Sequence, residues 1–328
     1  MLFKTVVFPL LVSVLLCGML TGCEKPVSNP PQKSEKPALP PLDMERIAAD
    51  EARGIKFSSD KRTLLKYNTE LKDPEYTVPD GVTAIGKRAF YRRGRSSLKR
   101  VTLPSSVTII GHHAFWMYHN LEKINLPPRV TTIGMGAFLT CGKIEASPDN
   151  PRFYNDAFGA LIDREEKTLL HVPSDISGGY TIPPGVTAIG LEAFWQCENL
   201  TDVTIPSGVT TIGDGAFANC GKLKSVAIPP GVTSIGMKAF SYCPNLTVIN
   251  IPEGVKNIGA AAFNRCSGLT VAMLPYSLET IGDWAFHDCE KLTDVTIPSG
   301  INSIGKGAFL GSPCEASVKK QFPNYRSW

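Results

Sequence analysis

The stretch Leu200-Thr201-Asp202-Val203-Thr204-Ile205-Pro206-Ser207-Gly208-Val209-Thr210-Thr211-Ile212-Gly213, with Ala216-Phe217, Cys220 and Leu223 after it, indicates the fold because it recurs. Copies follow at Pro229, Pro252, Pro275 and Pro298 with a period of 23 residues, and looser copies reach back to Pro79. A fixed period of this length is typical of a solenoid, in which similar units stack along one axis. We therefore expect a long surface rather than a catalytic pocket.

Each unit contains two extended segments. Val203 and Ile205 alternate with Asp202 and Thr204, which predicts a strand with one buried side, and Pro206 ends the strand because it lacks a ladder donor. Residues 209–212 form a second short extended piece, and residues 214–219 are expected to make one turn of helix. Stacked units should share one continuous apolar interior.

The spacing L-x-x-V-x-I-P, followed by x-G-V-T-x-I-G-x-x-A-F-x-x-C, resembles the BspA-like (Treponema-type) leucine-rich repeat family over residues 78–309. The resemblance implies a β-rich α/β solenoid, with a concave parallel sheet and short helical turns on the convex side. It also implies a role in adhesion or protein interaction. Gly208 stands where the family usually carries asparagine, which puts an asparagine ladder along the bend in doubt.

The repeat is interrupted once. An insertion at about residues 147–181 holds two apolar segments, 158–163 and 167–173, around a charged turn, and this pattern predicts a β-hairpin. A similar sequence pattern at residues 57–67 precedes the first unit, so we expect two blocks of coils, each beginning with a hairpin.

The predicted organisation of the rest of the chain follows from this interruption. Residues 43–77 form an N-terminal cap and hairpin, including a short helix that Asp43 caps, that Met44, Ile47 and Ala48 make apolar on one side, and that ends at Gly54. Residues 78–311 form the solenoid, and residues 312–328 a C-terminal cap.

The pattern of the N-terminal residues indicates a targeting segment. Residues 1–22 combine Lys4, an apolar run and small residues, which is typical of a signal peptide. The tetrapeptide Leu20-Thr21-Gly22-Cys23 resembles the lipobox of bacterial lipoproteins, which implies cleavage before Cys23 and its acylation; the alternative is an ordinary secretory signal. Residues 23–42 are then a proline-rich tether. We expect a lipid-anchored envelope protein, at the outer membrane or cell surface.

Charge and motifs argue against several classes of function. The full chain has 34 basic and 30 acidic residues, a net charge of +4, which is too small to indicate nucleic-acid binding. No phosphate-binding glycine motif or nucleophile–base arrangement is recognisable, so neither a cofactor nor an enzyme is expected. An enzyme would need a cluster of Asp156, Asp163, Glu165 and His171 in the insertion, which we interpret as an exposed turn.

Cysteines and histidines offer few metal sites. Six cysteines share one repeat position: Cys141, Cys197, Cys220, Cys243, Cys266 and Cys289. We favour buried thiols over disulfides or a metal because all six should point inward as small apolar groups, and the absence of a C-x-x-C pair argues against zinc. Cys314 is either a buried cap residue or a reactive thiol. His112, His113 and His119 could gather only if a loop folds back, so no metal site is predicted.

Two surfaces are candidates for binding. Val248, Asn250, Val271 and Met273 should point outward from neighbouring strands, and an exposed apolar patch marks a partner site about as often as it reflects scattered surface residues.

The second candidate is a basic cluster in the first coil. It is either a solvated rim or a docking patch for an anionic polysaccharide, lipid headgroup or acidic protein, and it contains Lys87, Arg88, Arg92, Arg93, Arg95, Lys99 and Arg100. Four aromatic residues beside the Ala-Phe pairs are expected to pack between coils rather than bind a ligand: Tyr91, Trp116, Trp195 and Trp284.

The sequence thus favours a surface-anchored, non-catalytic module that binds an unknown protein or polysaccharide and touches the membrane only through its lipid. The alternative is a structural envelope scaffold that faces the periplasm.

Overall fold

The computed structural model describes residues 38–91, 97–118 and 121–326. Helix α1 (Met44–Ala52) begins at Asp43, whose carboxylate accepts a hydrogen bond from the Arg46 backbone N–H at 2.9 Å. Of the three apolar helix residues expected to share a face, only Ile47 is buried. The helix instead turns Asp50 inward, where it accepts a 2.7 Å hydrogen bond from the hydroxyl of Tyr76.

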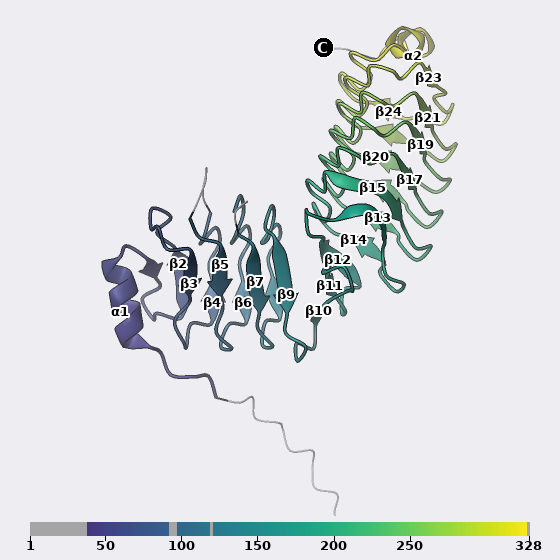
Figure 1. The fold of residues 1–328 in the computed structure, drawn as a ribbon. Helices are drawn as coiled ribbons and strands as arrows, with labels where there is room; N and C mark the ends of the chain where they lie inside the picture. Colours follow the sequence, from purple (N-terminus) through teal and green to yellow (C-terminus); the bar gives the residue numbers. More distant parts are fainter. Residues whose placement is uncertain (1–37, 92–96, 119–120, 327–328) are drawn as a thin grey trace, which may run out of the picture. The chain divides into compact units, whose positions relative to one another are not determined.

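The first block, β1 to β9, builds two sheets from alternate strands (Figure 1). One sheet opens with an antiparallel hairpin and continues in parallel, in the order β1 (Lys56–Phe57), β2 (Thr63–Lys66), β4 (Ala84–Ile85), β6 (Ile109–Ile110) and β8 (Thr132–Ile133). The other sheet is parallel and contains β3 (Glu75–Thr77), β5 (Arg100–Thr102), β7 (Lys123–Leu126) and β9 (Lys143–Ala146).

The second block, β10 to β24, repeats this plan at greater length. Its long sheet begins with the antiparallel strands β10 (Phe153–Asn155), β11 (Leu161–Asp163) and β12 (Thr168–His171). Parallel strands follow: β14 (Ala188–Ile189), β16 (Thr211–Ile212), β18 (Ser234–Ile235), β20 (Asn257–Ile258), β22 (Thr280–Ile281) and β24 (Ser303–Ile304). The predicted hairpin insertion is confirmed, and β10 is a strand that the sequence did not reveal.

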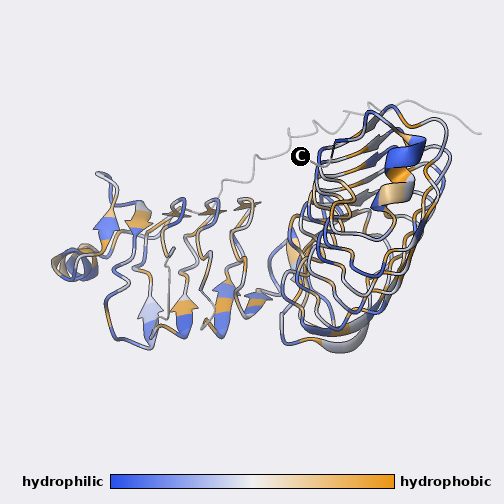
Figure 2. Cartoon of the chain, turned by 90° about the horizontal axis from the view of Figure 1, so that it is seen from above, coloured by the Kyte–Doolittle hydropathy of each residue, from blue (hydrophilic) through white to orange (hydrophobic). Residues whose placement is uncertain are grey.

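The strands that precede each proline form two short parallel sheets in the second block. The first contains β13 (Ser177–Thr181), β15 (Asn199–Thr204) and β17 (Ser225–Ala227). The second contains β19 (Val248–Asn250), β21 (Val271–Met273) and β23 (Asp294–Val295). Helix α2 (Glu315–Gln321) follows the last coil and buries Val318. Hydrophilic and hydrophobic residues alternate along the coils (Figure 2), as strands with one buried side require.

The apolar interior is divided, which corrects the expectation of one continuous core. Leu161 belongs to the core of the first block, whereas its neighbour Ile162 belongs to the core of the second block. Successive residues of a strand point to opposite sides, so β11 contributes one side chain to each core and separates the two cores.

A column of stacked phenylalanines runs through the second block. Rings from successive coils lie 4.7–5.2 Å apart at the centroids, with interplanar angles of 3–17°: Phe194, Phe217, Phe240, Phe263, Phe286 and Phe309. The cysteines lie beside this column as buried free thiols, in agreement with the favoured interpretation. Cys243 Sγ, for example, donates to the Phe217 carbonyl oxygen at 3.2 Å.

Residues 214–219, expected to form a helical turn, instead form overlapping β-turns. The N–H groups of Ala216 and Ala218 bond within the turn, to Gly213 and Gly215. The N–H of Phe217 between them bonds to Ala239 of the next coil at 2.7 Å. Sending alternate N–H groups to the neighbouring coil is incompatible with an α-helix, whose N–H groups all bond internally.

Candidate functional site

The strand face consists of the outward-pointing residues of the strands that precede each proline. In β19 and β21 the central residues Ile249 and Ala272 are buried, and the residues on either side of them point outward. The register pairs Val248 with Val271 and Asn250 with Met273. Neighbouring strands lie about 4.8 Å apart, so these four predicted residues form one contiguous surface.

This surface, the apolar patch, is exposed. Val248 retains 42% of its accessible area and Met273 retains 48%, while Val271 is half-buried and Asn250 is exposed. Asp294 pairs with Val271 on the next strand and limits the patch on that side. On the two preceding coils of the same block, the corresponding positions are Asp202 and Thr204, then Ser225 and Ala227. Ser225 donates to Asp202 at 3.4 Å.

The strand face of the first block is charged and internally paired. Arg100 forms an ion pair with Glu75, and Lys99 lies 3.1 Å from Glu122. These two predicted members of the basic cluster therefore already have carboxylate partners, which favours the solvated-rim interpretation for them. Arg92, Arg93 and Arg95 lie outside the described residues.

Tyr276 is a prominent surface residue that the sequence reasoning missed. It retains 86% of its accessible area, and its backbone N–H donates to Glu253 Oε1 at 2.9 Å. Other coils carry Ser, Pro, Asp or Glu directly after the strand-ending proline, so an aromatic residue at this position was the available signal.

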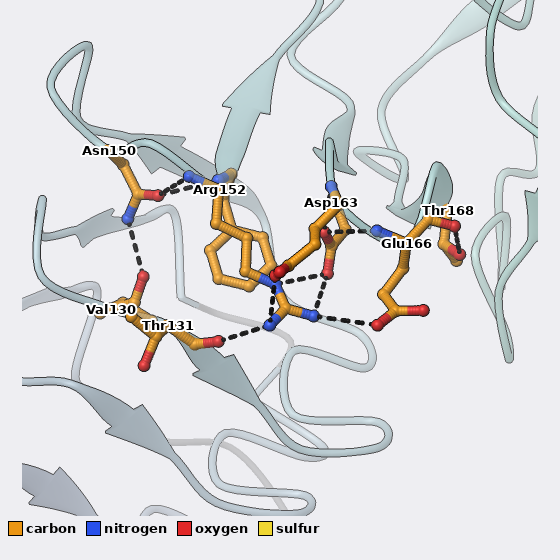
Figure 3. A network of polar contacts seen from close by, with 9 residues as sticks. Val130, Thr131, Asn150, Arg152, Asp163, Glu166 and Thr168 are labelled. Atoms are coloured by element: carbon orange, nitrogen blue, oxygen red, sulfur yellow. Dashed lines mark hydrogen bonds and ion pairs between the residues drawn. The ribbon is translucent and has the colours of Figure 1, made fainter.

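The charged residues of the insertion form a structural network rather than an exposed turn (Figure 3). Asp163 is buried, and Arg152 donates to its Oδ2 from Nε at 2.9 Å. The same guanidinium donates to the Thr131 carbonyl oxygen at 3.1 Å, and the Asn150 amide donates to the Val130 carbonyl oxygen at 3.1 Å. In the regular coils, the carbonyl oxygen at the Thr131 position accepts a hydrogen bond from a backbone N–H of the next coil, as the Thr108 carbonyl oxygen does from the Thr131 N–H. Side chains of the insertion thus close the open edge of the first block.

The other insertion residues considered for catalysis are also engaged. His171 is buried, its Nε2 lies 3.1 Å from the Gly142 carbonyl oxygen, and burial lowers its pKa to about 4. Asp156 accepts a 2.6 Å hydrogen bond from the hydroxyl of Tyr180. Glu165 is exposed and forms an ion pair with Arg152 at 3.0 Å.

A cavity of about 110 Å³ lies where the two blocks meet, lined by residues that include Ile133, Phe138, His171 and Glu192. Burial raises the pKa of Glu192 to about 7. This volume is well below the roughly 300 Å³ of a small-molecule site. The cavity is therefore not a ligand site.

The histidines and aromatic residues take part in packing. His112 Nδ1 accepts a hydrogen bond from the Met135 N–H at 3.0 Å, and His119 lies outside the described residues. Tyr91 and Trp116, from adjacent coils, stack at 5.1 Å as predicted, whereas Trp284 contacts His287 of its own coil. Within the described ranges, no group of three His, Cys, Asp or Glu side chains could hold a metal ion.

Cys23, the predicted lipid attachment point, lies outside the described residues. Searched over the described part of the chain, no helix combines the length and the apolar character that crossing a bilayer requires.

Comparisons with known proteins give a consistent family. A model described as "BspA type Leucine rich repeat region" matches residues 67–158 and 187–315 in six copies. No curated protein gives a significant match.

Solved structures with the same fold come from several bacteria. A leucine-rich cell surface protein from Faecalibacterium prausnitzii A2-165 is 31% identical, with a TM-score of 0.61, over 70% of this chain and 59% of that one. A leucine-rich repeat protein from Eubacterium ventriosum is 25% identical, with a TM-score of 0.54, over 76% of this chain and 88% of that one. The pneumococcal vaccine antigen PcpA is 23% identical, with a TM-score of 0.55, over 75% of this chain and 65% of that one.

Proposed function

Because the chain belongs to the BspA-type leucine-rich repeat family, we propose that it is a non-catalytic binding module held at the bacterial cell envelope by a lipid on Cys23. The lipobox-like Leu20-Thr21-Gly22-Cys23 supports the anchor. The description of the Faecalibacterium prausnitzii protein as a cell surface protein supports an outward location. The partner in this proposal is a protein or polysaccharide, and no cofactor takes part.

The apolar patch is the part of the surface that we propose to contact this partner. The observation that carries the proposal is the exposure of Val248 and Met273, at 42% and 48%, on two strands paired in register, on a face where most other outward-pointing residues are polar or ion-paired. Contiguous apolar surface that stays exposed in a monomer commonly marks an interaction site.

The test compares two substitutions at one repeat position. Met273→Lys places a charge in the apolar patch, whereas Thr204→Lys places it at the equivalent position on β15, where the native residue is already polar and exposed. Partners captured from envelope and extracellular extracts by the full chain should be reduced about tenfold or more by Met273→Lys and should be unaffected by Thr204→Lys. Equal capture by both variants would remove the patch from the proposal.

Protease shaving of intact cells tests the location. An outward-facing domain is degraded, while an internal periplasmic control protein is spared. Protection of both proteins would favour the alternative, a scaffold that faces the periplasm. Replacing Cys23 with Ser should release the protein from the membrane fraction if the lipid is its anchor.

A further inference from the structure

A second surface feature lies away from the strand face. A groove of about 570 Å³ crosses four coils of the second block, on the edge where the phenylalanine turn leads into the next strand, and Arg265 lies in the fourth of these coils. Gly221 lines the groove at the repeat position that Glu198 occupies in the previous coil and Pro244 occupies in the next. Because glycine has no side chain, a gap opens between Glu198 and Pro244, so a departure from the repeat creates this groove.

One wall of the groove is aromatic and held in place. Tyr242 retains 44% of its accessible area, and Arg265 Cζ lies 5.2 Å from the centre of its ring. Arg265 Nη1 also donates to the Tyr242 hydroxyl at 3.0 Å, and its Nε lies 3.4 Å from Asp288 Oδ2. The ring and the guanidinium are therefore oriented before any ligand binds, which lowers the entropic cost of binding.

The opposite wall is polar and contains a lysine without a carboxylate partner. Lys222 Nζ donates to Asn199 Oδ1 at 2.7 Å, and within the described part of the chain it forms no ion pair. Asn199 and Glu198 supply acceptors and an amide donor beside this ammonium group. The groove thus offers both donors and acceptors together with a free positive charge.

We propose that this groove binds a short acidic oligosaccharide, such as one that contains uronic acids. A sugar needs many donors and acceptors for its hydroxyls, and its C–H groups can pack on the amphipathic Tyr242 ring. A carboxylate on the sugar would form a charge-assisted hydrogen bond with Lys222. A peptide, by contrast, is usually anchored by large apolar side chains in apolar pockets, and the residues that line the groove include no Leu, Ile, Val, Met or Phe. The site is separate from the apolar patch and goes beyond the function proposed above.

The geometry at Gly221 allows the groove to be filled without disturbing the backbone. A Cβ placed on Gly221 would meet only the Glu198 carbonyl oxygen, at an ordinary 3.8 Å. Gly300, on a different corner of its coil, is a matched control because a Cβ there would meet only the Tyr276 carbonyl oxygen, at 3.7 Å. Gly221→Trp should therefore block the groove, while Gly300→Trp adds the same side chain elsewhere.

The experiment measures binding of the purified full chain to an array of uronic-acid oligosaccharides, their carboxyl-reduced neutral counterparts and a hexaglutamate peptide. We expect at least one acidic oligosaccharide to bind, and its carboxyl-reduced form to bind about tenfold more weakly or worse. Gly221→Trp should abolish this binding, whereas Gly300→Trp should not. Lys222→Met, which keeps the groove open, should remove the preference for the acidic form, and it provides the test if Gly221→Trp does not fold.

Several results would overturn the proposal: no acidic oligosaccharide binds, hexaglutamate binds equally well, or Gly221→Trp and Lys222→Met both bind like the unmodified chain. Met273→Lys should leave glycan binding unchanged. The apolar patch and the groove can therefore fail independently of each other.

Discussion

In the second block, phenylalanine rings of successive coils stack at 4.7–5.2 Å along the whole column. In the first block, Phe90 and Phe115 stack equally closely, at 4.7 Å, but the spacing widens to 5.8 Å between Phe115 and Phe138 at the end of the block. Most of the buried cysteines also lie in the second block, and the first block contributes Cys141. The first block instead balances charges on its strand face and ends at side chains of the insertion. Near-identical coils therefore stabilise one another by stacking, while an irregular stack depends on specific polar contacts at its end.

The sharpest test of this comparison removes one ring from each block. Phe240 is fully buried between two stacked rings, so Phe240→Ala should lower the free energy of unfolding by about 4 kcal/mol. Phe138 is 4% exposed and stacks on one ring, so Phe138→Ala should cost roughly half as much. Urea unfolding of the two variants measures both values. Equal losses would show that the two blocks do not differ in how much ring stacking stabilises them.

The next test addresses the boundary between the blocks. Arg152→Met leaves the buried Asp163 carboxylate and the Thr131 carbonyl oxygen without this donor, and should destabilise the protein by about 3 kcal/mol. The exposed Glu165 provides the control, because Glu165→Gln should cost less than about 0.5 kcal/mol.

Two further results follow from the same contact. Arg152→Met should increase hydrogen exchange at β8 before it affects β18, because the lost contacts lie at the edge of the first block. The double variant Arg152→Met with Asp163→Leu should recover part of the stability, since no buried charge remains unpaired. Unchanged exchange at β8 would show that the network does not close this edge.

A smaller effect for each residue is expected from the thiols at alkaline pH. Burial raises the pKa of Cys266 from 9.0 to about 12, and that of Cys197 likewise. Each group binds its proton more tightly in the folded state, so its contribution is complete below pH 9 and is lost as the pH rises from 9 towards 12. The slope should reach about 1.4 kcal/mol per pH unit for each such thiol.

Urea unfolding at about pH 8 and about pH 10.5 measures this loss. Cys266→Val should flatten the decline by the share of one thiol. Cys141→Val should also flatten the decline by the share of one thiol, here in the first block, because burial raises the pKa of Cys141 as well. An identical pH slope in the variants and the unmodified chain would contradict the assignment.

The smallest effect should come from the charged strand face. Arg100 and Glu75 are about half exposed, at 50% and 60% of their side-chain areas, so Arg100→Ala should change the free energy of unfolding by no more than about 0.5 kcal/mol. Thermal unfolding at low and high salt checks this value. A loss as large as that of Arg152→Met would mean that the strand face, and not the insertion, holds the first block together.

Local patterns in the sequence predicted much of the fold. The alternation around Val203 and Ile205 predicted the strands, and the repeat position that Cys220 shares with five other cysteines predicted their burial, because these patterns recur from coil to coil. The apolar patch was found in the same way, since Val271 and Met273 occupy positions that are polar in most other coils.

Features that depend on one particular pair of neighbours were not predicted. Arg152 lies 11 residues from Asp163 and 21 from Thr131, and nothing local in the sequence indicates that it bonds to both. The groove likewise depends on one local combination, in which Glu198 and Pro244 of the adjacent coils flank Gly221, which has no side chain. The turn at residues 214–219 was predicted as helical because hydrogen bonds to the next coil leave no trace within a single unit.

The tail after the last coil affects how copies of the protein can associate. The Gly307 N–H, which would otherwise seek a further coil, bonds to the Arg326 carbonyl oxygen at 2.9 Å. The Phe309 N–H bonds to the Tyr325 hydroxyl at 2.8 Å. These donors are already used, so a second copy cannot continue the ladder from this turn. The tail thereby opposes end-to-end growth into filaments, to which a stack of self-complementary units is otherwise prone.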